Sequence, residues 1–522
     1  MTSEQATKIM KLLEMKSSVY ELEMDSIPIW WFIRFRFYDR LLNYLNQEEE
    51  KKETFKNRNI SIRTIIYNCK KSGVFLLRSL SSLIHIATTR YKKRPILFLV
   101  YPTGFKKTKE EIQFDIYINS TYQKLSNKSI VIERPTLKEQ DLQSFLFRKN
   151  TIFLDWAILF SILKNCFKLW KIPKINNWKK FKNKCEGVNF EIISSKWILN
   201  TIKELIFSTR NKIIIQITAA EIILNRFKPK VIVETVSYDS GTVALNLIAK
   251  RQNIPVIELQ HGIITKNHIG YIYFIPSDYT KNKPLPDKIL VYGEAFKKAI
   301  LRTGNAFSSK DIIVTGFPRL NNFLSQAQSK REFIRVEARK KLGIDNNIFL
   351  ATITSQPITN SYLSHFLEKA IPLLEKNIII CVKLHPSELD DWGTIYRDIS
   401  FHPQVKIVSD NDINLYELLI SSDVHATVCS TVFLECLALG IPNVILKGPG
   451  YSFVLELVKE DEILIADNPE EFVKLLNKLK LNKNSRNAII QKEKEICSLF
   501  FARKNSSENL ILEEIAKLYD KK

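Results

Sequence analysis

The cysteines of this sequence are too scattered to build a metal site or a disulfide framework. There are seven of them, and none forms a CxxC or CxxxH pattern. Structural zinc sites need closely spaced Cys and His pairs, and disulfide frameworks are typical of small secreted domains. Paired carboxylates at a metal-binding spacing are missing too. We therefore expect reduced core thiols in a cytosolic protein that requires no metal.

Long hydrophobic runs are also missing. The sequence has no uninterrupted stretch of about 18 apolar residues, so no transmembrane helix is predicted. The closest approach, residues 152–163, is short and carries Asp155, which fits a buried helix better. Residues 1–25 mix charges throughout and do not have the pattern of a secretory signal.

The common phosphate-binding and nucleic-acid-binding patterns are absent as well. Neither a P-loop nor a GxGxxG fingerprint occurs, and no helix-turn-helix, RNP or zinc-finger pattern is present. Lys and Arg nevertheless number 78 against 55 Asp and Glu, a formal charge of +23. This excess indicates either an anionic neighbour (nucleic acid, phosphorylated substrates or an acidic membrane face) or a lysine-rich coding bias. Nucleic-acid binding is therefore a distant alternative that rests on charge alone.

The sequence begins with a segment that has the character of helices. Residues 1–94 show no strand alternation, and we expect a helical extension there. Aromatic residues in it are interleaved with arginines, namely Trp30, Trp31, Phe32, Phe35 and Phe37 with Arg34, Arg36 and Arg40. Aromatic and basic residues together suit a membrane interface, and the alternative is an amphipathic helix packed on the following domain.

Short apolar segments then alternate with helical ones, as is typical of parallel, doubly wound sheets. We expect a first Rossmann-like domain over 95–285, closed by a proline-containing linker at 281–287, and a second domain over 286–485. Residues 486–522 are predicted to be helical. The fold class is thus α/β. The two domains are expected to face each other across a cleft at the carboxyl ends of their strands, where such proteins bind nucleotides.

Polar residues follow the predicted strands of the first domain. Gln260, His261 and Gly262 end one apolar strand, and Glu234 stands near the end of another. Strand ends are where an open α/β sheet presents ligand-binding groups. Glu258, inside the strand before the Gln-His-Gly motif, is interpreted as a structural hydrogen-bonding residue.

The second domain has a comparable set. Arg319 follows one predicted strand, His385 follows another, and Ser430 and Thr431 begin a helix after a third. Hydroxyl and N–H groups at the start of a helix form a seat for phosphate, with the helix dipole behind them. Arg and His side chains donate hydrogen bonds to phosphate oxygens. These residues therefore predict anion binding.

The motifs QHG, TGxPR, KLHP and a Ser-Thr helix start followed by ECLALGIPNVIL occur in this order over roughly residues 230–450. In this order they resemble the bacterial surface-polysaccharide glycosyltransferases. That group includes the CDP-glycerol glycerophosphotransferases of teichoic acid synthesis, the capsule polysialyltransferases and related Kdo transferases. The resemblance implies a GT-B fold, with a nucleotide-activated donor held mainly by the second domain and an acceptor held by the first.

The resemblance also implies residue roles. His385 would contact the donor phosphate, Ser430 and Thr431 would seat phosphate or carboxylate, and Arg319 would line the same pocket. His261 would reach the reacting centre from the opposite domain. The other motif residues in this predicted site are Lys383, Gln260, Gly262, Gly316 and, for the donor ribose, Glu435.

Transfer to an acceptor needs a base that takes the hydroxyl proton. Our candidates are Glu234, Asp239 and His261, in no firm order. Asp239 has the alternative role of capping the helix that follows it. Three further histidines are interpreted as ordinary surface or loop residues, namely His268, His365 and His402.

The expected function is a glycosyltransferase or polyol-phosphate transferase for a capsule, O-antigen or teichoic-type polymer. We expect it to be inverting and without a cofactor, in the cytoplasm or peripheral on the inner face of the membrane. The segment VCSTVF replaces the more usual Asp-Tyr-Ser-Ser of the glycerophosphotransferases, which leaves the donor open. A CMP- or CDP-linked donor is preferred, with UDP or GDP as alternatives. A sugar-nucleotide 2-epimerase of GT-B fold is the alternative function.

Overall fold

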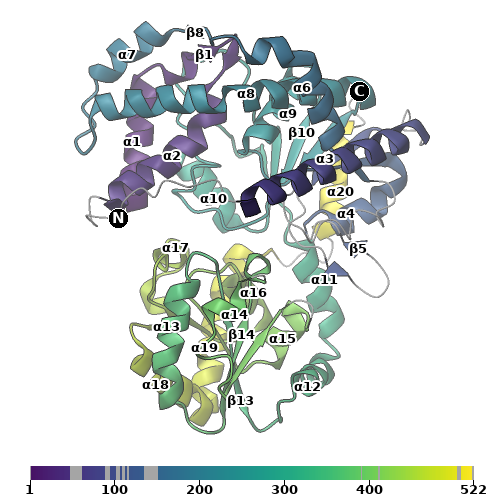
Figure 1. Cartoon of the computed structure of the whole chain (residues 1–522). Helices are drawn as coiled ribbons and strands as arrows, with labels where there is room; N and C mark the ends of the chain where they lie inside the picture. Colours follow the sequence, from purple (N-terminus) through teal and green to yellow (C-terminus); the bar gives the residue numbers. More distant parts are fainter. Residues whose placement is uncertain are drawn as a thin grey trace. The chain divides into compact units, whose positions relative to one another are not determined.

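The computed structural model describes residues 2–47, 62–88, 94–100, 106–107, 112–113, 117–134, 151–389, 391–409, 412–502 and 507–519. The chain divides into two units (Figure 1). The first unit comprises Met1–Leu290, Lys297–Ile313 and Glu508–Lys522, and the second comprises Val291–Phe296 and Val314–Ser507.

The first unit contains a seven-stranded sheet with the order β12-β11-β10-β9-β3-β6-β7. The pairs β3–β6, β6–β7, β3–β9, β9–β10 and β10–β11 are parallel. The chain first adds strands on one side of β3 and then, from β9 on, on its other side, so the sheet is doubly wound. The strands are β3 (Ile96–Val100), β6 (Ser129–Glu133), β7 (Thr151–Phe153), β9 (Val231–Glu234), β10 (Val256–Leu259), β11 (Lys288–Val291) and β12 (Ile312–Val314).

These strands lie in the interior of the unit because they carry apolar side chains on both faces of the sheet. All residues of β3, β6, β9 and β10 are buried, as expected for parallel strands covered by helices. The helices of this unit are α1 (Thr2–Lys16), α2 (Trp30–Gln47), α3 (Ile62–Thr88), α4 (Asn119–Leu125), α6 (Asp155–Leu169), α7 (Trp178–Glu186), α8 (Ser195–Phe227), α9 (Ser240–Arg251), α10 (Glu294–Thr303) and α20 (Ser507–Tyr519). Two small antiparallel sheets pair β1 (Glu23–Met24) with β2 (Ile27–Pro28) and β8 (Ile175–Asn176), and β4 (Lys106–Lys107) with β5 (Ile112–Gln113).

Helix α2 belongs to the core of the first unit. Trp30, Trp31 and Phe37 are buried in one cluster with residues of α8 and α9. Arg34 is buried as well, with its Nε 2.5 Å from Oε1 of Glu14. The aromatic residues of this segment are therefore not available to a membrane surface. The structure supports the other interpretation, a helix packed on the following domain.

The second unit contains a six-stranded sheet with the order β15-β14-β13-β16-β17-β18, and its neighbouring strands are all parallel. The order again reverses beside the first strand, between β13 and β16. The strands are β13 (Phe349–Thr354), β14 (Ile378–Lys383), β15 (Val405–Val408), β16 (Val424–Thr427), β17 (Asn443–Leu446) and β18 (Leu464–Ala466). The helices are α11 (Pro318–Ala327), α12 (Arg331–Leu342), α13 (Asn360–Ala370), α14 (Trp392–Ile395), α15 (Leu415–Ser421), α16 (Val432–Leu439), α17 (Ser452–Leu455), α18 (Pro469–Leu481) and α19 (Lys483–Phe500).

The boundary between the units differs from the expected 95–285 and 286–485. Strands β11 and β12 extend the first sheet, and the predicted linker is fixed to that unit because Oδ2 of Asp287 accepts the Val256 N–H at 2.8 Å. Within 486–522, α19 packs on α16, whereas Ile511 and Ile515 of α20 pack on the first sheet. Hydrophobic patterning could not show this, because an apolar strand has the same pattern in either sheet.

Two doubly wound, Rossmann-like sheets in separate units are the domains of the GT-B fold, as the sequence indicated. The cleft expected between them stays a prediction. No helix in the described part of the chain is long and apolar enough to cross a membrane.

Candidate active site

The turn after β10 fixes His261 at the carboxyl end of a central strand. Gln260 is buried, and its backbone N–H donates to the Leu290 carbonyl at 2.9 Å. Its side-chain Nε2 donates to the Gly262 carbonyl at 2.7 Å. Gln260 therefore holds the backbone on both sides of His261. A Cβ at Gly262 would meet nothing within 4 Å, so space is not the reason for this glycine.

Two tyrosines flank the His261 ring. The Tyr238 hydroxyl lies 3.3 Å from Nε2, and the Tyr271 hydroxyl lies 3.4 Å from Nδ1. Burial lowers the pKa of His261 to about 4, because the imidazolium would lose its hydration. The ring is therefore neutral near pH 7 and has one nitrogen that can accept a proton.

Tyr271 connects His261 to a buried carboxyl group. Its hydroxyl donates to Oε1 of Glu258 at 2.8 Å. A hydroxyl that gives its only proton to Glu258 can act only as an acceptor toward His261. When Glu258 accepts from Tyr271, this contact favours the tautomer with the proton on Nδ1 and the lone pair on Nε2. The hydrogen bonds from His261 to Tyr271 and from Tyr271 to Glu258 thus favour the tautomer that a base needs, with a lone pair on Nε2.

Glu234 and Glu258 are register partners on the neighbouring strands β9 and β10, and both are buried. Asn246 donates to Oε1 of Glu234 at 2.9 Å. Burial, reinforced by the charge of Glu258, raises the pKa of Glu234 well above its ordinary value, and burial raises the pKa of Glu258 to about 7. This shift favours the protonated form of Glu234, and its burial closes it to solvent, which both speak against our prediction of it as the base. The hydrogen-bonding role expected of Glu258 is confirmed.

Asp239 caps helix α9. Its Oδ1 accepts the Gly241 N–H at 2.8 Å and lies 2.5 Å from Nη1 of Arg134. Burial alone would raise the pKa of Asp239, but the Arg134 charge and the Gly241 N–H outweigh it and lower the pKa. A carboxylate stabilised in this way is a weak base. The capping alternative is confirmed, and a catalytic role for Asp239 stays an untested prediction with this argument against it.

His268 joins the same group, whereas we expected an ordinary surface or loop histidine. Its ring centroid lies 5.4 Å from that of Tyr238 and 5.0 Å from that of Tyr271. Burial and the neighbouring His261 lower its pKa to about 4. The loop can approach this closely only because Gly270 has no side chain, since a Cβ there would lie 2.4 Å from the Tyr238 ring.

In the second unit, His385 is fixed at the end of β14. Its backbone N–H donates to Oγ of Ser355 at 3.1 Å and to Oε2 of Glu388 at 2.9 Å. Its ring Nδ1 accepts the Ser387 N–H at 3.2 Å. The neutral ring must then carry its proton on Nε2. That nitrogen is a hydrogen-bond donor, which suits a phosphate oxygen.

The start of α16 follows the neighbouring strand β16. Oγ of Ser430 accepts from the Val432 N–H at 3.3 Å and from Nε2 of Gln356 at 3.2 Å, and Ser430 is buried. Thr431 is exposed, and its side chain makes no capping bond to the helix. Ser430 thus shapes the helix start, while the Thr431 hydroxyl is accessible. Glu435 is half-buried in the first turn of the same helix.

The second sheet brings these elements together at one edge. Strand β13 lies between β14 and β16. Ser355 follows β13, His385 follows β14, and Ser430 follows β16. This is the point where the strand order of the sheet reverses, which is where open α/β sheets bind ligands. The position and the donor groups favour anion binding.

The other predicted residues have structural contacts. Lys383 is buried, and its Nζ donates to the Leu384 carbonyl at 3.4 Å. The Arg319 guanidinium lies over the Tyr416 ring at 4.9 Å. Gly316 has a φ of +83°, and a Cβ there would lie 2.4 Å from Oγ of Ser507, so the backbone itself requires glycine. Roles of these residues in donor binding stay predictions.

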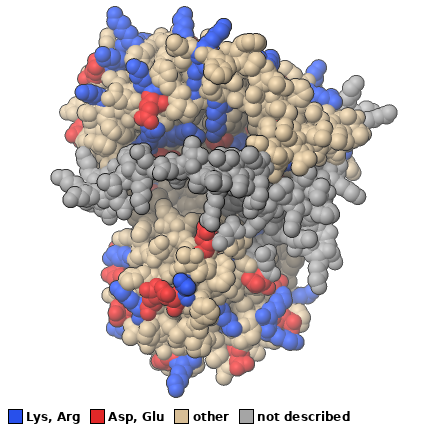
Figure 2. Space-filling view, viewed as in Figure 1, with Lys and Arg blue, Asp and Glu red and all other residues tan. Residues whose placement is uncertain are grey.

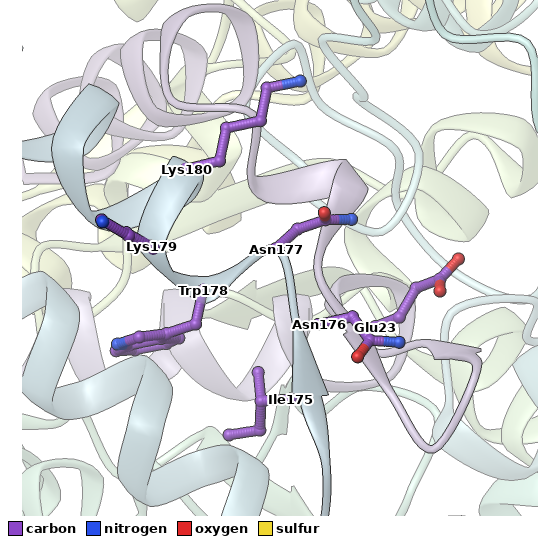
Figure 3. A pocket seen from close by; sticks show the side chains of 7 residues that line it. All are labelled: Glu23, Ile175, Asn176, Asn177, Trp178, Lys179 and Lys180. Carbon is purple, nitrogen blue, oxygen red and sulfur yellow. The ribbon is translucent and has the colours of Figure 1, made fainter.

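An open cavity of about 860 Å³ lies elsewhere in the first unit (Figure 3). It is lined by Glu23 and residues 175–180, and none of the predicted site residues lines it. Figure 3 shows the charged ends of Glu23 and Lys180 well apart at its rim. This cavity therefore does not identify the reaction site. Within the described ranges, no group of three or more His, Cys, Asp or Glu side chains is placed to hold a metal ion.

Sequence reasoning missed the partners of both histidines. Tyr238 and Tyr271 stand beside His261, and Ser355 and Gln356 stand beside His385 and Ser430. The strand-end position marked each histidine, but most of its partners come from other loops, and Tyr271 lies ten residues further along the same connection. The position of Ser355 and Gln356 directly after a buried strand is a signal that could have found them.

Comparison with known proteins indicates one family. The family model described as CDP-glycerol:poly(glycerophosphate) glycerophosphotransferase matches residues 179–511. No curated protein matches the chain. Similar solved structures include UDP-GlcNAc 2-epimerase from Neisseria meningitidis bound to UDP-GlcNAc, with 14% identity and a TM-score of 0.48, covering 81% of this chain and 99% of that one. The wall teichoic acid polymerase TagF has 12% identity and a TM-score of 0.47, covering 89% of this chain and 99% of that one.

Proposed function

The chain belongs to the CDP-glycerol:poly(glycerophosphate) glycerophosphotransferase family, and from this premise we propose that it transfers a polyol phosphate, or a sugar, from a cytidine-nucleotide donor. The acceptor is a hydroxyl of a surface polysaccharide or a lipid-linked glycan. The observation that carries the proposal is the family match over residues 179–511, which include His261, His385 and the helix start at Ser430. The protein is thus an enzyme, a transferase that uses a nucleotide-activated donor.

Family membership favours transfer over the 2-epimerase alternative and over nucleic-acid binding. The positions of His385 and Thr431 support a donor site in the second unit, because an N–H donor and an accessible hydroxyl stand at the reversal point of a doubly wound sheet. UDP- and GDP-linked donors are the alternatives that the nucleotide-binding test below can identify.

His261 is our candidate for the base. For a polyol-phosphate donor, its Nε2 takes the proton of the acceptor hydroxyl while the acceptor oxygen forms a bond to the distal phosphorus of the donor. The bond from this phosphorus to the oxygen of the departing nucleotide breaks, and CMP leaves with the bonding electrons. The acceptor gains a polyol phosphate, and the proton stays on His261 until it is released. This direct displacement inverts the configuration at the reacting centre.

The residues behind His261 support this assignment. After the proton transfer the ring is an imidazolium, and its Nδ1–H faces the Tyr271 oxygen, which is hydrogen-bonded to Glu258. Glu258, whose pKa is raised to about 7, stabilises the developing positive charge when it is ionised. Neither alternative base has such an arrangement, because Glu234 is buried with its pKa raised and Asp239 is paired with Arg134.

Nucleotide binding is the first test. The full chain is heated with CMP, CDP, UMP, UDP, GDP or AMP, and a ligand that binds the folded state at a hundredfold excess over its Kd stabilises it by ~2.7 kcal/mol. We expect a cytidine nucleotide to raise the Tm and the His385→Ala variant to lose most of this rise. A shift with UDP or GDP alone would change the donor. No shift with any of the six would overturn the donor site.

The reaction itself is tested with CDP-glycerol and CMP-linked sugars in the presence of a glycan acceptor, by following nucleotide release and acceptor labelling. Transfer with release of CMP supports the proposal. Conversion of UDP-GlcNAc to its 2-epimer without any acceptor would replace it by the epimerase alternative.

A further inference from the structure

Helix α3 buries Arg78, Ser79 and Ser82 together with Ile86, whereas most of its leucines face solvent. Leu76, Leu77, Leu80 and Ile84 are 54%, 56%, 56% and 57% exposed. On the opposite side, Arg78 is buried with its Nε 3.4 Å from Oδ2 of Asp155. A helix on a water-exposed surface normally has the reverse arrangement, with its apolar stripe on the core.

Helix α6 and the residues that follow it show the same inversion. Phe160, Leu163, Phe167 and Trp170 are 44%, 62%, 86% and 90% exposed, at a spacing that places them along one side of a helix. The buried side of α6 carries polar groups, and Nδ2 of Asn165 donates to Oγ1 of Thr218 in α8 at 2.9 Å. Trp156 anchors the start of this helix in the core, whereas further along the buried side is polar and four large apolar side chains remain outside.

The two inverted helices form one surface. Helices α3 and α6 pack against each other, and Arg78 of α3 pairs with Asp155 at the start of α6. We call the eight exposed residues of the two preceding paragraphs the α3–α6 face. Figure 2 shows that the surface over α3 and α6, at the upper right of the first unit, is almost free of charged side chains, with lysines and arginines along its upper border.

A stripe of lysines accompanies this face. Lys164, Lys168 and Lys171 are exposed and recur with the spacing of the apolar stripe of α6, one residue further along the chain. The segment 156–185 contains eight lysines and no Asp or Glu. None of these three lysines forms an ion pair with a residue that the structure describes. The surface thus combines exposed aromatic and aliphatic side chains with positively charged lysines.

We propose that the α3–α6 face docks on an anionic lipid surface, with Phe167 and Trp170 among the acyl chains and headgroups and the lysines at the phosphate level. Aromatic, leucine and lysine side chains on one side of a helix are the composition that binds this kind of surface. A second copy of the chain is a poorer occupant, because a symmetric contact would bring the two lysine stripes together. The aromatic residues of α2 that the sequence offered for this purpose are occupied instead, because four of them are buried and Phe35 stacks on Tyr238.

The inference extends the proposed function by naming where the enzyme would meet a lipid-linked acceptor, but it does not depend on the donor or the reaction. Its failure can therefore be distinguished from failure of the transferase proposal. Nucleotide binding is measured without lipid, and lipid binding is measured without nucleotide.

The test is flotation of the full chain with phosphatidylcholine vesicles that contain or lack phosphatidylglycerol. We expect the protein to float with the anionic vesicles, and the Phe167→Ser/Trp170→Ser variant to lose about tenfold in bound fraction. The Lys164→Gln/Lys168→Gln/Lys171→Gln variant should bind anionic vesicles no better than neutral ones. All these side chains are exposed, so the variants should unfold at the temperature of the wild type.

Two matched controls separate this face from a general attraction by net charge. Phe401→Ser removes an aromatic side chain that is 91% exposed in the second unit, and Lys474→Gln/Lys478→Gln/Lys494→Gln removes the same charge from exposed positions there. Both should float like the wild type. The proposal is overturned if the wild type stays off anionic vesicles or if the controls lose as much binding as the face variants. It is also overturned if light scattering shows a dimer that Phe167→Ser/Trp170→Ser abolishes and flotation is unchanged.

Discussion

The histidines at the strand ends of the two units, His261 and His385, are held in opposite ways. At His261 the hydroxyl of Tyr271, which donates to Glu258, assigns the proton to Nδ1 and leaves Nε2 to accept. At His385 the Ser387 N–H donates to Nδ1, so the proton lies on Nε2. The same residue type at a strand end thus has an accepting Nε2 in one unit and a donating Nε2 in the other, although the two strands, β10 and β14, hold different positions in their sheets.

The largest effect is expected at His261. Replacing it by Gln removes the proton acceptor but keeps a polar side chain, so kcat should fall by about 10²- to 10⁴-fold. Nucleotide affinity should be unchanged, because the residues that we propose for donor binding belong to the second unit. Single-turnover rates and calorimetric titration with the nucleotide measure the two quantities.

The matched control for this change is His365→Gln. His365 is exposed on α13, as expected from the sequence, and should tolerate the change. If His261→Gln weakens nucleotide binding as strongly as turnover, His261 is a binding residue and the contrast with His385 disappears.

The reverse pattern is expected at His385. A hydrogen bond to a charged group contributes about 1.5–3 kcal/mol, so His385→Ala should raise the nucleotide Kd by about 10- to 100-fold. The kcat at saturating donor should change far less. The Asn variant, whose amide can still donate, should recover part of the affinity, and His402→Ala serves as the control. A large fall of kcat with unchanged Kd would contradict the donor role.

A smaller effect is expected behind His261. Tyr271→Phe removes the hydroxyl that fixes the tautomer, and the loss of one such hydrogen bond, about 0.5–1.5 kcal/mol, corresponds to a fall in kcat of about 3- to 10-fold. Donor KM should be unchanged. Tyr238→Phe is the matched control, because that hydroxyl lies beside Nε2 and does not connect to Glu258. Equal losses in the two variants would mean that packing around the ring, and not its tautomer, is what matters.

These contrasts also show how far sequence reasoning reached. The doubly wound sheets followed from short apolar strands, and His261 and His385 were found because polar residues stood directly after them. Tyr271 follows His261 by ten residues in the same long connection between β10 and β11, and no local pattern in that connection relates it to His261 or Glu258. Long-range contacts of this kind depend on the packing of the whole unit.

Helices α2 and α3 show a second limit. Both carry apolar and arginine residues, and the more aromatic of the two was the natural candidate for a membrane surface. In the structure Arg34 of α2 is buried beside Glu14, whereas α3 buries Arg78 and exposes its leucines. Helical periodicity indicates that a helix has two different sides. It does not indicate which side faces the protein when a buried carboxylate on another segment attracts the arginine.

The last expected effect concerns stability and pH and leaves activity aside. Burial raises the pKa of Glu258 to about 7 from an ordinary value of 4.5. Between these two pH values the unfolded chain loses this proton while the folded chain keeps it. The free energy of unfolding therefore falls as the pH rises from 4.5 to about 7, by at most about 1.4 kcal/mol per pH unit. Glu258→Gln has no such proton and keeps an oxygen that can accept from Tyr271. Its stability relative to the wild type should therefore increase from pH 5 to pH 7, as measured by denaturant unfolding, whereas the exposed Glu495→Gln should show no such trend. A parallel pH dependence of wild type and Glu258→Gln would mean that Glu258 is ionised in the folded protein throughout this range. Tyr271 would then donate to a carboxylate at every pH tested.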